Sequence, residues 1–179
     1  MDNVGYDMYC KILSESINEA KGINTNQTDD VSIEISDNAY IPERYIESPQ
    51  QRIDMYKKIA SIETEEEKFE ICDELIDRYG DMPKPVLNII AVASTKIPAR
   101  EVGCIEILEK QRTITLKFAE GRLTPEVVFG LDGKFKGRVK VLSSDVPAVS
   151  VKMTERDNGV LEFVKILLIL IKELQNPTK

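Results

Sequence analysis

The sequence contains no histidine and no tryptophan among its 179 residues. The lack of histidine excludes Ser-His and Cys-His catalytic arrangements and every metal site built on imidazole ligands. Cysteine is also scarce: Cys10, Cys72 and Cys104 are odd in number, widely spaced and free of any C-x-x-C pair. Such a pattern is typical of a reduced, cytoplasmic compartment, where disulfides are rare.

Long apolar runs are absent as well. A membrane-spanning helix needs about 20 consecutive apolar residues, and charged side chains interrupt even the most hydrophobic stretch, residues 160–174. The N-terminus has no basic segment followed by an apolar one, so it does not resemble a signal peptide. We therefore expect a cytoplasmic protein that does not associate with membranes.

Apolar residues make up 42% of the chain and charged residues 31%, enough for a core of normal size in one ordinary domain, or in one domain with an appendage. The formal net charge is −7, and it is unevenly distributed. Residues 1–80 hold 19 acidic and 8 basic side chains, whereas residues 81–179 hold 12 acidic and 16 basic ones. The acidic first part would repel nucleic acid rather than attract it.

Three segments follow one another along the chain. Residues 1–22 carry apolar side chains at helical spacing and end in glycine, which predicts a linker helix. Residues 23–30 are polar and predict a flexible linker. Residues 31–179 are expected to form the main domain.

Within the main domain, helical and strand-like patterns are grouped rather than strictly alternating. Helices are predicted at residues 49–62, 64–79, from Pro83 or Pro85 onwards, from Thr124 through Leu131, and at 158–175. Strands are predicted at residues 31–35, 105–107, 114–118, 139–141 and 149–153. This grouping favours an α+β domain in which helices pack on a small, mostly antiparallel sheet.

The helix predicted at 64–79 has the clearest pattern in the chain. Thr64 and Glu67 form a capping box, and Gly80 provides the stop. At 100° per residue its apolar stripe contains Phe69, Cys72, Ile76 and Tyr79. The opposite side carries Glu67, Glu70, Glu74, Asp77 and Arg78. An acidic side that keeps like charges at i,i+4 spacing is a candidate docking surface for a basic partner. The alternative is a side that only confers solubility.

A second candidate is a basic run near residue 137. Lys134, Lys136, Arg138 and Lys140 alternate with Phe135, Gly137 and Val139. On a strand the four cations would share one face, and with the adjacent aromatic ring they could follow a nucleic-acid backbone. The alternative here is a solvated strand face.

No catalytic set, metal site or cofactor site is predicted. Carboxylates are numerous, but a small hydrolase using carboxylates alone would need a pocket that separates two of their pKa values. Gly133 and Lys134 resemble the end of a phosphate-binding loop, yet Phe135 stands where Ser or Thr would bind magnesium. Cys72 and Cys104 lie in apolar patterns and are interpreted as core residues.

Several blocks of sequence occur in a specific order and spacing. They are residues 37–42, 51–53 with 56–57, 63–67, and 74–80 followed by Pro83. In this order they resemble the C-terminal domain of the bacterial transcription-repair coupling factors (Mfd). Residues 5–13 are similar to the segment that leaves the second motor lobe in that family. The resemblance is dense up to about residue 108 and weak over the last 60 residues.

The resemblance implies that the chain is a piece of a large ATP-dependent DNA translocase that displaces stalled RNA polymerase and recruits the nucleotide excision repair protein UvrA. None of the family's motor motifs occurs in this chain. The resemblance also implies a non-catalytic, autoinhibitory domain, which docks on the N-terminal UvrB-like module of the same protein and masks the UvrA-binding surface. The family's contact residues correspond to Glu74, Asp77 and Arg78, and Glu70 lies on the same side by helical angle.

Overall fold

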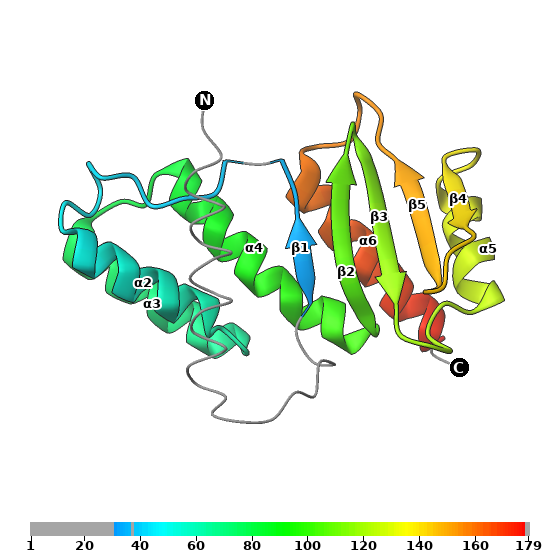
Figure 1. Ribbon diagram of the computed structural model, residues 1–179, viewed down its shortest axis with the longest axis horizontal. Coiled ribbons are helices and arrows are strands. Elements are labelled where there is room, and N and C mark those ends of the chain that lie inside the picture. Colours follow the sequence, from blue (N-terminus) through cyan, green and yellow to red (C-terminus); the bar gives the residue numbers. More distant parts are fainter. Residues whose placement is uncertain (1–30, 37, 178–179) are drawn as a thin grey trace. The chain divides into compact units, whose positions relative to one another are not determined.

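The computed structural model describes residues 31–36 and 38–177 (Figure 1). The helix expected at residues 1–22 and the linker expected at 23–30 lie outside the described residues, and both remain predictions. Among the described residues, no helix has the length and hydropathy required to span a membrane.

The described chain forms two compact units. The first comprises residues 38–94, and the second comprises residues 31–36 together with residues 95–177. The first unit is helical, whereas the second contains the whole sheet. The start of the main domain at residue 31 remains a prediction.

The first unit holds the candidate docking helix. Its helices are α2 (Pro49–Ala60), α3 (Glu65–Tyr79) and the first part of α4 (Lys84–Glu101). Helix α2 begins where the Ser48 hydroxyl accepts a hydrogen bond from the backbone N–H of Gln51 at 3.4 Å. The Tyr56 hydroxyl accepts another from the N–H of Ile41 at 2.7 Å, which joins α2 to the preceding segment. The three helices predicted for this region are confirmed.

The second unit is a five-stranded sheet with two helices of its own. The elements are β1 (Ser32–Glu34), β2 (Cys104–Lys110), β3 (Thr113–Phe118), α5 (Pro125–Lys134), β4 (Val139–Leu142), β5 (Ala148–Lys152) and α6 (Val160–Gln175). The strand order is β1-β2-β3-β5-β4, and only β1 and β2 pair in parallel. The predicted α+β fold with a mostly antiparallel sheet is therefore confirmed.

The core of the second unit lies between one face of the sheet and α6, which runs behind the strands in Figure 1. The fully buried sheet residues are Ile107, Ile114, Leu116, Phe118, Val149 and Val151. The fully buried residues of α6 are Val164, Leu167, Leu168 and Ile171. Removing this apolar surface from water is the main stabilising contribution to the unit.

Strand β2 differs from the prediction at one residue. The alternating pattern predicts that Ile105 and Ile107 share the buried face, but Ile105 is 37% exposed and Cys104 is buried instead. Cys104 pairs with Phe118 and Glu106 pairs with Lys117, so β2 holds one residue more than β3 between these pairs. This β-bulge shifts the alternation by one position. The apolar pattern alone gave no sign of it.

The basic run is not a strand, so the prediction that its four cations share one strand face is wrong. Lys134 is the last residue of α5, Phe135 is buried, and β4 begins only at Val139. Arg138 is already engaged, because its Nη1 lies 2.7 Å from the Asp157 carboxylate. The Arg138 guanidinium also lies 5.0 Å from the centroid of the buried Phe135 ring, a contact that the period-two pattern does not encode.

The β2–β3 hairpin has a strained turn. Its two central residues, Gln111 and Arg112, have φ angles of 50° and 57°. This left-handed region costs roughly 1–2 kcal/mol for an ordinary side chain, and two-residue turns of this kind prefer asparagine and glycine. Arg112 is held there because its backbone O accepts from Met153 N–H at 2.7 Å and its Nη2 donates to Thr154 O at 2.6 Å.

We expect Gln111→Asn to raise the free energy of unfolding by about 0.5–1 kcal/mol, because asparagine tolerates positive φ. The denaturant midpoint of the chain measures this effect. Gln111→Val is the matched control and should lower the midpoint, since a β-branched side chain is strained at positive φ. Equal midpoints for the two variants would show that the turn conformation does not limit stability.

Candidate docking surface on helix α3

Helix α3 begins with the predicted capping box. The Thr64 hydroxyl accepts from the N–H of Glu67 at 3.2 Å, and the Glu67 carboxylate accepts from the N–H of Thr64 at 3.2 Å and of Glu63 at 2.7 Å. Glu65, Glu66 and Glu67 occupy the first turn, where negative charge is favoured by the helix dipole. The sequence therefore fixes this end of the helix locally.

The buried side of α3 is rotated from its predicted position. Leu75 is fully buried, whereas Phe69 and Ile76 of the predicted apolar stripe are 63% and 47% exposed. Cys72 and Tyr79 are half-buried at the border between these two sides. The stripe prediction is thus right for Cys72 and Tyr79 and wrong for Phe69 and Ile76, because packing selected the side centred on Leu75.

Two tyrosines hold the C-terminal end of α3. The Tyr45 hydroxyl lies 3.2 Å from the carbonyl oxygen of Leu75 and 3.0 Å from that of Gly80, and it can donate to either. The Tyr45 ring packs against the Tyr79 ring at 5.8 Å between centroids. Burial, with a smaller contribution from Asp81, raises the pKa of Tyr45. The end of α3 is therefore anchored by contacts from outside the helix.

Glu74 is engaged within the chain rather than free. Its carboxylate lies 2.7 Å from the Lys58 ammonium of α2 and 2.6 Å from Arg78 Nη1 one turn along α3. The hydrogen bonds from Lys58 and then from Arg78 hold the pKa of Glu74 below its usual range. The Arg78 guanidinium also lies 5.0 Å from the centroid of the Tyr79 ring. Of the four predicted contact residues, Glu74 thus already joins α3 to α2, and Arg78 is engaged within α3.

Glu70 and Asp77 remain available to a partner. Both are exposed, and within residues 31–36 and 38–177 neither has a hydrogen bond or an ion pair. Glu66 and Asp73 are also exposed and share their side of the helix by i,i+4 and i,i+3 spacing. We call Glu66, Glu70, Asp73 and Asp77 the acidic face. The prediction did not include Glu66 and Asp73, although their spacing was visible in the sequence.

The remaining candidates are metal-ligand clusters and the two cysteines that the structure describes, Cys72 and Cys104. In the part of the chain that the structure describes, no three His, Cys, Asp or Glu side chains converge as metal ligands. Cys104 is buried, and burial raises the pKa of its thiol to about 12. Burial also raises the pKa of the half-buried Cys72. Both thiols are disfavoured as nucleophiles, since the thiolate is the reactive form.

The fold and the site together define an α+β protein with a firmly anchored, acidic surface helix. Residues 35–126, which are 92 of the 179 residues, match the family described as TRCF domain. The chain therefore belongs to the transcription-repair-coupling factor family.

Individual relatives agree with this assignment. Proteins named transcription-repair-coupling factor from Staphylococcus epidermidis and Bacillus subtilis are each 33% identical, over 97% and 100% of this chain. The chain spans only 15% and 16% of the length of these two relatives.

A solved structure is similar as well. A crystal structure of the C-terminal domain of a transcription-repair coupling factor superposes with a TM-score of 0.68, covering 86% of this chain and 99% of the other. The two sequences are 20% identical, so this likeness supports the fold.

Proposed function

We propose that this chain is the regulatory C-terminal part of a transcription-repair coupling factor, a DNA translocase driven by ATP that displaces stalled RNA polymerase in DNA repair. The chain itself acts without catalysis. It docks through α3 on the N-terminal UvrB-like module of the same protein, masking the surface that binds UvrA and restraining the motor.

The observation that carries this proposal is the exposure of the Glu70 and Asp77 carboxylates on α3. Both carboxylates are exposed and unpaired among the described residues, yet they project from a helix held by Leu75, Tyr45 and the Glu74–Lys58 pair. A rigid helix presents its charges without a further loss of conformational entropy, which favours complementary binding. Glu74 and Arg78 assist indirectly, by holding the helix in place.

The electrostatic character of the acidic face suits a contact that must open. Regulatory coupling is typically about 1–3 kcal/mol, and exposed ion pairs contribute up to roughly 1 kcal/mol each. A few pairs formed by the acidic face with a basic partner would give a coupling of this size. A large apolar interface would hold the two parts together too strongly for release.

The test is a titration of the 179-residue chain with the N-terminal module of its parent protein. We expect the double reversal Glu70→Lys with Asp77→Lys to weaken binding by about 10-fold to 100-fold, because two attractive pairs become repulsive. The affinity of the unchanged chain should fall as salt is raised, since exposed charges are screened. Isothermal titration calorimetry measures both effects.

The matched control reverses two exposed carboxylates elsewhere, Glu120→Lys with Glu155→Lys. This variant has the same net charge and should bind within about twofold of the unchanged chain, as surface changes remote from an interface usually do. Equal losses in both variants would show that net charge alone governs the interaction. An affinity unchanged by the Glu70 and Asp77 reversal would remove the acidic face from the contact.

The nucleic-acid alternative based on Lys134 to Lys140 is not supported as a basic strand. It required four cations on one strand face, and Lys134 lies in α5 while Arg138 pairs with Asp157. Of the four cations in that run, only Lys140 lies in a strand, β4.

A further inference from the structure

The face of the sheet opposite the core is mostly polar and carries a lysine from each of four strands, β2, β3, β4 and β5. Side chains alternate along a strand, so residues between the core positions project from this second face. We call it the open face. Its residues in the second unit include the exposed Lys110, Lys140 and Lys152, the half-buried Thr113 and Thr115, and the buried Ser150. Because they come from β2, β3, β4 and β5, only the strand pairing brings them together.

The register places these residues in two adjacent rows. Thr113 pairs with Lys110 on one side and with Lys152 on the other. In the next row Ser150 pairs with Thr115 and with Lys140. Neighbouring strands lie about 4.8 Å apart. In each row, a lysine and a hydroxyl-bearing residue are therefore separated by no more than two strand spacings.

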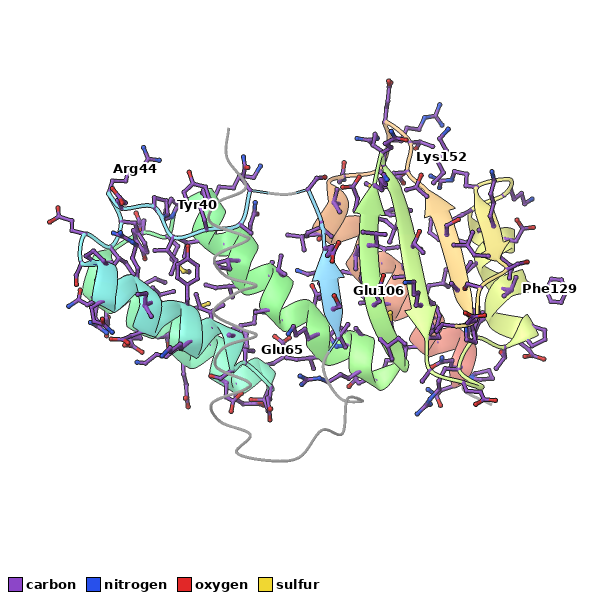
Figure 2. All side chains as sticks on the ribbon, in the orientation of Figure 1. Tyr40, Arg44, Glu65, Glu106, Phe129 and Lys152 are labelled. Carbon is purple, nitrogen blue, oxygen red and sulfur yellow. The ribbon has the colours of Figure 1, made fainter. Side chains whose placement is uncertain are left out.

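The net charge of this surface is positive. Lys110, Lys140 and Lys152 are exposed, and none of them has an ion-pair partner among the described residues. Figure 2 labels Lys152 near the end of the β2–β3 hairpin and Glu106 on the same sheet. The Glu106 carboxylate is neutralised by Lys117 at 2.9 Å.

The other carboxylate on the open face, Glu34, lies far from Lys140 and Lys152 but is a diagonal neighbour of Lys110, because Glu34 pairs with Leu108, two residues before Lys110 on β2. Glu34 is on β1, at the sheet edge opposite β4. The half of the open face formed by β3, β5 and β4 is therefore cationic.

We propose that Lys110, Lys140 and Lys152, with the hydroxyls of Thr113 and Thr115, bind the phosphate backbone of duplex nucleic acid. Ammonium and hydroxyl groups are the usual donors to phosphate oxygens and carry no sequence information. Single-stranded nucleic acid needs aromatic side chains on which bases stack. The described strand residues of the open face include no aromatic side chain, so the surface suits a duplex.

This surface shares no residue with the acidic face of α3 and does not rest on the proposed docking. It shares only Lys140 with the basic run predicted from the sequence. Lys134 and Lys136 lie outside the strands and are not part of it.

The test is a fluorescence anisotropy titration of a labelled duplex of about 20 base pairs with the full chain, at about 50 mM and about 200 mM salt. We expect weak, salt-dependent binding that the triple variant Lys110→Gln, Lys140→Gln, Lys152→Gln reduces at least about tenfold. Each lost phosphate contact should lower the slope of log affinity against log salt by about 1.

The control is a second triple variant, Lys57→Gln, Lys84→Gln, Lys134→Gln, which removes the same charge from positions outside the open face. We expect it to bind the duplex within about threefold of the unchanged chain, because the loss of three charges outside the contact acts only through the overall charge of the protein. Thermal unfolding checks that both variants remain folded. Equal losses in the two variants, or no duplex binding at the lower salt, would overturn the proposal. So would tighter binding of a single strand of equal length, or equal competition by polyglutamate, because either would identify a different ligand.

Discussion

Leu75→Ala is expected to lower the free energy of unfolding by about 2–5 kcal/mol, the usual cost of truncating a fully buried leucine. The side chain of Leu75 has no exposed surface, and it is the one residue of α3 that is completely buried in the described chain. Its loss should loosen α3 and increase hydrogen exchange of the α3 backbone amides. Denaturant unfolding together with hydrogen exchange measures the effect.

Ile76→Ala is the matched control, one residue further along the same helix. Ile76 is 47% exposed, so its truncation should cost less than about 1 kcal/mol. The apolar stripe predicted from the sequence would give the opposite order, since it places Ile76 inside. A larger effect of Ile76→Ala would show that α3 packs through the predicted side.

Asp157→Ala should destabilise the second unit by about 2–3 kcal/mol, because it removes a charged hydrogen-bond acceptor shared by several donors. Asp157 Oδ2 accepts from Arg138 Nη1 at 2.7 Å, from Thr154 N–H at 2.6 Å and from the Thr154 hydroxyl at 2.8 Å. Without it, the Arg138 guanidinium would lose its anion while remaining 5.0 Å from the centroid of the buried Phe135 ring. Thermal unfolding measures the loss, and Asp145→Ala in an exposed bend provides the control.

The stabilisation by Asp157 should also depend on pH. Partial burial raises the pKa of Asp157, but the hydrogen bonds from Thr154 and Arg138 outweigh it and the pKa is lowered overall. A lowered folded-state pKa means that the stabilisation is complete above the unfolded value of about 3.9 and is lost as the pH falls through the folded value. The gap between wild type and Asp157→Ala should therefore close in acid. A gap that stays constant down to about pH 2 would contradict the ion pair.

The two proposed surfaces differ in how far the sequence could predict them. The acidic face depends on one helix, so helical spacing alone is enough to place Glu70 and Asp77 together. That spacing could not show that Glu74 is paired with Lys58, because this partner lies on another helix. The open face depends on the pairing of four strands, and no local pattern connects Lys110 with Lys152.

Local signals determined the elements themselves. The capping box at Thr64 fixed the start of α3, and alternation fixed the strands that contain Ile114 and Val149, because these patterns act through neighbours in the chain. Tertiary structure decided which side of each element is buried where apolar residues occupy more than one side. In α3, Leu75 is buried and Ile76 is exposed. In β2, a β-bulge places Cys104 rather than Ile105 on the buried face. The reason is that burial depends on the shape of the surface each element packs against, and that surface is formed by residues distant in sequence.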